Sequence, residues 1–240
     1  MIYKVIGISF CSNLKNNREA EKNVNIIKVD EKIEVEKLDK DKGLKEIEEK
    51  IKLKEKKAIF VGGDHSITYA LVKATKPNML VIFDAHADLI RPLKTITNED
   101  WLRALINEKI LDTKNIVMIG LRNYDKKEEY FIRDNNIPCI FLDKEGIELT
   151  LDDITDFIME KMKEKEKIYL SIDIDFINGC EIEANFKEPF GFSSREFFYI
   201  LKRISKLKEK IDFIDIVEGF ASDEKTRKII EKIIEIFNQK

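Results

Sequence analysis

The sequence predicts an α/β fold in which a mostly parallel sheet lies between two layers of helices, a three-layer α/β/α sandwich. Short apolar runs alternate with charged amphipathic stretches along almost the whole chain. Strands separated by helices imply right-handed crossovers, which place parallel strands in one sheet with helices on both faces. Because residues 1–240 contain no repeat, low-complexity tract or linker, we expect a single domain over 1–240.

The expected elements follow one another in order, apart from a polar stretch that runs to about residue 41 and has no clear assignment. Apolar runs of strand length predict strands at 3–10, 57–63, 79–88, 115–122, 138–142, 167–176 and 211–219. Longer stretches with apolar residues at helical spacing predict helices at 44–57, 66–75, 98–109, 125–136, 150–167, 193–210 and 222–239.

Composition excludes several classes of protein. Acidic and basic side chains nearly cancel, to a formal charge of −3, so there is no basic excess for binding nucleic acid or an anionic membrane. No apolar run approaches the length of about 20 residues that spans a bilayer, and the first ten residues do not have the pattern of a signal peptide. Three cysteines without a CxxC pair argue against a disulfide framework. We therefore expect a cytoplasmic protein.

Ionisable side chains gather where the predicted strands end, which is the edge at which parallel sheets bind ligands. In "VIFDAHAD" (81–88), Asp84, His86 and Asp88 occupy alternate positions, so a strand would direct all three to one face. The complete set of such residues is His65, Asp84, His86, Asp88, Asp173, Asp175 and Glu218.

Taken alone, each of these residues has an ordinary structural explanation as a turn former, a helix cap or a hydrogen-bonded core residue. The combination is more informative, because both histidines of the chain lie at strand ends and no Lys or Arg falls inside these motifs. Buried carboxylates without a counter-charge are costly. Four aspartates and two neutral histidines carry a formal charge of −4, which two divalent cations balance. Carboxylate oxygens with some imidazole and no thiolate favour Mn²⁺.

The motifs "GGDHS" (62–66), "DAHAD" (84–88) and "SIDIDF" (171–176) resemble the three metal signatures of the ureohydrolases, the arginase and agmatinase family. The resemblance extends from about Ala58 to Gly219. It implies an arginase-like fold and a hydrolase with two Mn²⁺ per subunit, which cleaves a guanidino C–N bond to release urea and an amine. The default substrate that it implies is agmatine, converted to putrescine and urea in polyamine metabolism.

The resemblance also implies roles for individual residues. One ion is expected on His65, Asp84, Asp88 and Asp173, and the other on His86, Asp84, Asp173 and Asp175. Asp88 would also orient the attacking hydroxide. Glu218 would pair with the substrate guanidinium, whose parallel N–H groups suit a carboxylate. The resemblance further implies a homo-oligomer, a trimer or hexamer.

The sequence departs from the family pattern after two of the motifs. Asn98 stands near the place of a family histidine thought to handle protons, so it is either a catalytic position or the N-cap of helix 98–109. The loop after Asp175 lacks the usual DP and PG pairs. Arg91 is either a solvated loop residue or a substrate-binding residue that selects a distal carboxylate.

Two other functions stay open at this point. The altered loops allow an amidohydrolase that acts on formimino or acylated-amine substrates. Asn98 in place of the histidine allows a catalytically silent, metal-bound homologue that binds a guanidino or polyamine ligand.

Overall fold

A computed structural model describes residues 3–13, 18–52, 57–142 and 149–239. Its strands are β1 (Lys4–Ile8), β2 (Glu31–Ile33), β3 (Ala58–Val61), β4 (Met79–Phe83), β5 (Ile116–Leu121), β6 (Cys139–Phe141), β7 (Ile168–Asp173) and β8 (Ile211–Val217). Its α-helices are α1 (Lys40–Lys52), α2 (Ser66–Thr75), α3 (Trp101–Asn107), α4 (Lys126–Asp134), α5 (Leu151–Lys163), α6 (Ser194–Ile204) and α7 (Glu224–Asn238).

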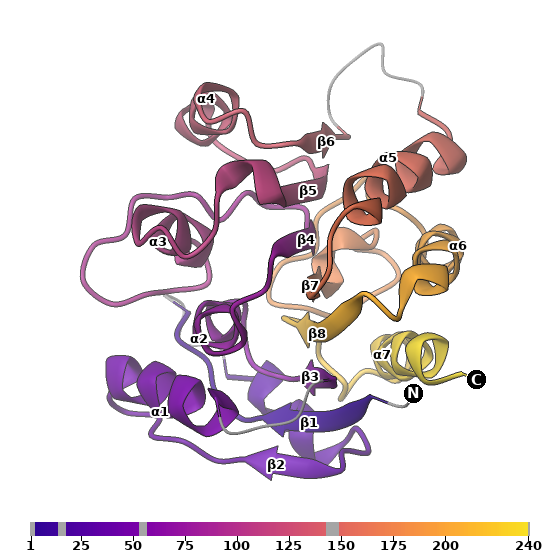
Figure 1. Ribbon diagram of the computed structural model, residues 1–240. Coiled ribbons are helices and arrows are strands. Elements are labelled where there is room, and N and C mark those ends of the chain that lie inside the picture. Colours follow the sequence, from indigo (N-terminus) through magenta and orange to yellow (C-terminus); the bar gives the residue numbers. More distant parts are fainter. Residues whose placement is uncertain (1–2, 14–17, 53–56, 143–148, 240) are drawn as a thin grey trace.

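The eight strands form one parallel sheet in the order β2-β1-β3-β8-β7-β4-β5-β6. Helices α1 to α4 cover one face of this sheet, and α5 to α7 cover the other (Figure 1). The predicted three-layer α/β/α architecture is therefore confirmed.

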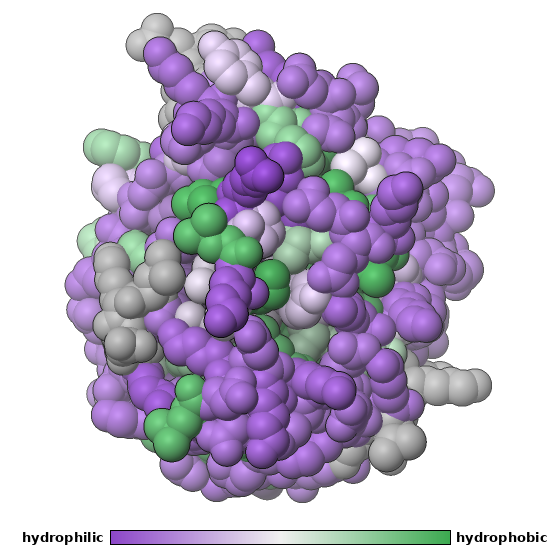
Figure 2. Space-filling view, turned by 90° about the vertical axis from the view of Figure 1, so that its left-hand side faces the viewer, coloured by the Kyte–Doolittle hydropathy of each residue, from purple (hydrophilic) through white to green (hydrophobic). Residues whose placement is uncertain are grey.

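Alternation along the buried strands divides the core into two halves. In β4, Val81 and Phe83 pack against the layer of α5 to α7, whereas Leu80 and Ile82 pack against the layer of α1 to α3. Such strands are apolar at every position, because both faces of a parallel sheet are covered. The outer surface seen in Figure 2 is mostly hydrophilic, as the Lys- and Glu-rich helices lead one to expect.

Most of the predicted elements are present, with shorter ends. The unassigned N-terminal stretch holds a 3₁₀ helix at Ala20–Asn25 and the edge strand β2. Part of the predicted helix 44–57, residues 53–56, lies outside the described residues. The prediction of Asn98 as a helix N-cap is wrong: α3 begins at Trp101, and Asp100 is its N-cap residue. None of the helices in the described ranges combines the length and apolarity needed to cross a membrane.

Candidate metal centre

The candidate site lies at the carboxyl ends of β3, β8, β7 and β4, which are neighbours in the middle of the sheet. His65 follows β3, the 84–88 motif follows β4, and Glu218 follows β8. Asp173 is the last residue of β7, and Asp175 lies in the 3₁₀ helix Ile174–Phe176. The seven predicted side chains therefore come from four adjacent strand ends, although they are spread over more than 150 positions of the sequence.

A first group of ligand atoms surrounds the ring of His65. The Nδ1 atom of His65 lies 3.0 Å from Asp84 Oδ2, 3.0 Å from Asp88 Oδ2 and 3.4 Å from Asp173 Oδ2. All these side chains are almost completely buried. His65, Asp84 and Asp88 are close enough together to hold one metal ion.

A second group surrounds His86 and shares Asp84 with the first. The Nδ1 atom of His86 lies 2.8 Å from Asp175 Oδ2 and 3.6 Å from Asp84 Oδ1. Asp84, His86 and Asp175 are again close enough together for one ion. The two carboxylate oxygens of Asp84 thus face different histidines, an arrangement that suits a carboxylate bridging two cations.

Hydrogen bonds behind His65 leave its Nδ1 atom free for a cation. The hydroxyl of Ser171 donates to Asp215 Oδ1 at 2.7 Å, and its oxygen lies 2.9 Å from His65 Nε2. Because the single hydroxyl proton is used on Asp215, the Ser171 oxygen accepts from Nε2–H. A neutral ring held in this way presents the Nδ1 lone pair to the three aspartates, and this is the form in which histidine binds a metal.

Two buried atoms fit a bound metal. His65 Nδ1 and Asp175 Oδ2 make no hydrogen bond of acceptable geometry with any described residue, although each lies close to the other ligand atoms. Burial opposes the charged imidazolium, yet the carboxylates of Asp173, Asp84 and Asp88 raise the pKa of His65 well above its usual value. Burial and the charge of Asp84 raise the pKa of Asp88 to about 7. Without a metal ion the carboxylates thus favour a proton on His65, and a divalent cation that displaces this proton would fit the same donor set.

Glu218 lies beside this cluster with a positive φ of 65°. Its Oε1 accepts the backbone N–H of His65 at 2.9 Å, and its other oxygen accepts from the amide of Asn185. Burial and the charge of Asp64 raise the pKa of Glu218 to about 8. A buried carboxylate in this state gains from a cationic partner.

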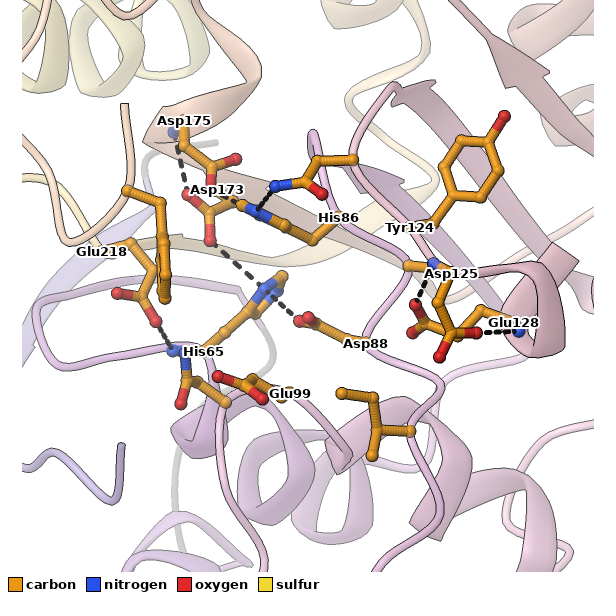
Figure 3. Close-up of a pocket in the computed structure, with 15 residues that line it drawn as sticks. His65, His86, Asp88, Glu99, Tyr124, Asp125, Glu128, Asp173, Asp175 and Glu218 are labelled. Atoms are coloured by element: carbon orange, nitrogen blue, oxygen red, sulfur yellow. Dashed lines mark hydrogen bonds and ion pairs between the residues drawn. The ribbon is translucent and has the colours of Figure 1, made fainter. Parts of the chain in front are cut away.

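The cluster opens into a pocket of about 330 Å³. The pocket is lined by His65, His86, Ala87, Asp88, Ile90, Asn98, Glu99, Asn123, Tyr124, Asp125, Glu128, Asp173, Asp175, Phe186 and Glu218. Figure 3 shows Glu99 beside His65 and Asp88, with Asp125 and Glu128 across the pocket. Within the described parts of the chain, the lining contains carboxylates but no Lys or Arg.

The other two predicted site residues lie in different places. Asn98 is buried in the pocket wall, and its Oδ1 has no hydrogen-bond partner among the described residues. Arg91 is exposed and is not part of the pocket lining; it borders a separate surface hollow together with Arg103.

Three residues outside the predicted set also belong to the site. Glu99 lines the pocket, Asn185 binds Glu218, and Trp101 donates its indole N–H to Asp88 Oδ2 at 2.5 Å. Trp101 is the only tryptophan of the chain, which is a signal that could have drawn attention to it. Asn185 lies in an irregular loop, where no periodicity indicates the direction of a side chain.

Arg122, the residue that follows β5, holds the loop that follows Asp175. Its guanidinium donates to the carbonyl oxygens of Asp175 at 2.6 Å, Pro189 at 2.9 Å and Gly120 at 3.2 Å. One side chain thus connects the end of β5, the metal motif after β7 and the far end of the loop. This loop carries Asn185 and Phe186 to the pocket.

Comparisons with known proteins find similar sequences and similar folds. Over 181 residues the chain is 30% identical to an arginase of Staphylococcus aureus (strain COL), an alignment that covers 67% of this chain but only 59% of the relative. An arginase structure from Bacillus subtilis superposes with a TM-score of 0.86 at 19% identity, covering 100% of this chain and 99% of that one. Formimidoylglutamase from Bacillus subtilis gives a TM-score of 0.82 at 17% identity, covering 98% and 85%.

These two structures show a shared fold, and the alignment to the curated arginase spans less than two thirds of that relative's length. The family match itself is more extensive, since residues 6–234 match the family described as "Arginase family". That range includes the four strand ends that carry the candidate centre. The chain belongs to the arginase family.

Proposed function

We propose that this protein is a hydrolase that uses two Mn²⁺ ions to cleave a guanidino C–N bond, releasing urea and an amine. One observation carries the proposal: two groups of possible ligands share the buried Asp84, and the other members of both groups line one pocket with Glu218. His65, Asp84, Asp88 and Asp173 would hold one ion, and His86, Asp84, Asp173 and Asp175 the other.

The residues of the site would have different roles in the reaction. When bound, the two ions activate water for attack on the guanidino carbon and stabilise the developing charge. Glu218 would fix the substrate by accepting N–H donors from its guanidinium. Asp88, which lies against His65 on the pocket side, would orient the attacking oxygen. Asn98 would contact the substrate through its unpaired amide oxygen.

The charge of the pocket favours a substrate with a cationic distal end. Beyond the proposed metal ligands and Glu218, the lining contributes the carboxylates of Glu99, Asp125 and Glu128. Agmatine carries an ammonium group at the end opposite its guanidinium, whereas 4-guanidinobutyrate carries a carboxylate there. Because like charges repel in a site of low dielectric, we propose agmatine as the substrate, with putrescine and urea as products. Arg91 would then have no role in binding it.

Urea release from agmatine by manganese-loaded protein tests the proposal. Metal is first removed with a chelator, and activity is measured before and after Mn²⁺ is added. We expect activity only with Mn²⁺, faster turnover of agmatine than of 4-guanidinobutyrate, and no effect of Arg91→Ala. An Asp173→Ala variant, which loses a shared ligand, should be inactive. If no guanidino compound yields urea, the proposal is wrong.

The same assay separates the two other functions. An amidohydrolase would release formamide or acetate, rather than urea, from formimino or acylated-amine substrates. A silent homologue would bind agmatine tightly without turnover. The acidic pocket disfavours formiminoglutamate, which carries two carboxylates, for the same reason that it disfavours 4-guanidinobutyrate.

We further propose that the protein acts in the cytoplasm as a trimer or hexamer. The oligomeric state rests on the resemblance to the arginase family, and the location rests on the composition of the sequence. Light scattering coupled to size-exclusion chromatography measures the assembly, and a monomeric mass would contradict it.

A further inference from the structure

Trp101 contacts two of the proposed ligands of one ion. Its indole Nε1–H donates to Asp88 Oδ2 at 2.5 Å, and its ring lies 4.6 Å from the His65 ring between centroids, with 39° between their planes. The side chain is completely buried. A water molecule therefore cannot take over its hydrogen bond to Asp88 without a rearrangement of the core.

Helix α3 holds Asp88 at both its side chain and its backbone. The N–H of Arg103 donates to the Asp88 carbonyl at 3.4 Å, while Trp101 holds the carboxylate. Asp88 has a φ of 51°, in the left-handed region that non-glycine residues seldom adopt. Such a conformation persists only where the surrounding contacts impose it. The first turn of α3 supplies those contacts.

The hydrogen bond from the Trp101 indole N–H determines the orientation of the Asp88 carboxylate. Because the indole occupies one lone pair of Oδ2, the carboxylate is fixed with its remaining lone pairs toward His65 Nδ1, 3.0 Å away. Packing of the indole on the imidazole fixes the plane of the second ligand as well. The two ligands come from different strand ends, so a single side chain sets their relative position.

We propose that Trp101 is a positioning residue for the metal ion held by His65 and Asp88, acting through its indole N–H. The inference rests on the proposed metal centre. Loss of a hydrogen bond to a metal ligand commonly weakens metal affinity by about 10–100-fold. We expect this loss at the ion of His65 and Asp88, and not at the ion of His86 and Asp175.

The test exploits the fact that the chain has one tryptophan. Production in a tryptophan auxotroph supplied with 3-benzothienylalanine replaces this one indole by a ring of nearly the same shape without the N–H. Mn²⁺ binding to native and substituted protein is measured by electron paramagnetic resonance of free Mn²⁺. A Trp101→Phe variant repeats the measurement with a smaller ring.

The expected result is two ions in both proteins, one of them bound about 10–100-fold more weakly in the substituted protein. Thermal unfolding of the metal-free forms should agree within a few degrees, which shows that folding is intact. A Tyr3→Phe variant is the matched control, because it loses a buried aromatic donor, the hydroxyl bonded to the Ile211 carbonyl at 2.7 Å, far from the site. Its two affinities should equal those of the native protein.

Tryptophan fluorescence gives a second readout in native protein. Paramagnetic Mn²⁺ beside His65 should quench the emission of Trp101, and Asp88→Asn should lose this quenching at the same Mn²⁺ concentration. Two ions bound with native affinity in the benzothienyl protein would overturn the positioning role while leaving the proposed function intact. A native protein that binds no Mn²⁺ would overturn both.

Discussion

Asp84 is the residue whose substitution most directly tests the paired centre, because it is common to both ligand groups. Asp84→Asn keeps the size of the side chain and its capacity to accept the His86 backbone N–H, which lies 2.7 Å from Oδ1. It removes the negative charge that both ions need. Asp88→Asn is the matched variant, because Asp88 belongs to the first group alone.

The expected shift in Tm on adding Mn²⁺ follows from mass action. An ion that binds only the folded protein stabilises it by about 2.7 kcal/mol at a free concentration 100 times its Kd, so two ions contribute about 5.4 kcal/mol. For a chain of this length, 1 kcal/mol shifts Tm by about 2–4 °C, which gives a total of about 11–22 °C. Asp84→Asn should lose nearly all of this shift, and Asp88→Asn about half.

Differential scanning calorimetry with and without Mn²⁺ measures both variants. Each variant is compared with its own metal-free form, so that the effect of the substitution on folding cancels. Mg²⁺ at the same concentration serves as the ion control. An Mn²⁺-induced shift in Asp84→Asn as large as that of the native protein would refute the shared-ligand geometry.

Three further variants test other contacts. Glu218→Gln removes the charge that would pair with the guanidinium, so kcat/KM for agmatine should fall about 10²-fold or more while Mn²⁺ binding stays unchanged. Urea release measures kcat/KM, and titration with Mn²⁺ measures metal binding. An unaltered kcat/KM would exclude the pairing. Arg122→Lys loses the planar donor fork on three backbone carbonyls, which should cost about 2–3 kcal/mol in urea unfolding. A native midpoint would show that the loop is held by other contacts. Phe176→Ala removes a fully buried ring that stacks on Phe192 at 4.9 Å between centroids. Calorimetry should show that the free energy of unfolding falls by about 3–5 kcal/mol. A fall below 1 kcal/mol would mean that the core closes over the cavity.

The sequence was sufficient for the sheet and the motifs because both depend on local patterns. Buried parallel strands are continuous apolar runs, and the ligands follow them directly, which indicates the carboxyl edge of the sheet. The predicted strand 79–88 is too long, because β4 ends at Phe83 and the 84–88 motif lies in irregular backbone. The short strand β2 was missed, since three residues at the sheet edge, including Glu31 and Lys32, give too little periodicity.

The predictions that differ from the structure concern residues in loops. Asn98 was expected to cap a helix that in fact begins three residues later, because Asp100 occupies the N-cap position and accepts the N–H of Thr97 at 2.7 Å. Arg91 follows the metal motif by three residues, yet the chain has already turned away from the pocket there. Irregular backbone directs side chains by tertiary contacts that no spacing rule encodes.

The position of β8 between β3 and β7 has a consequence for how the molecule is made. The sheet order places β8 (Ile211–Val217), which follows the other seven strands in the sequence, at its centre. Until that segment leaves the ribosome, the earlier strands can pair only as two half-sheets, β2-β1-β3 and β7-β4-β5-β6, each with an open apolar edge. Insertion of β8 joins the halves and brings His65 beside Asp84 and Asp173, so the metal-binding geometry cannot form before β8 has been synthesised.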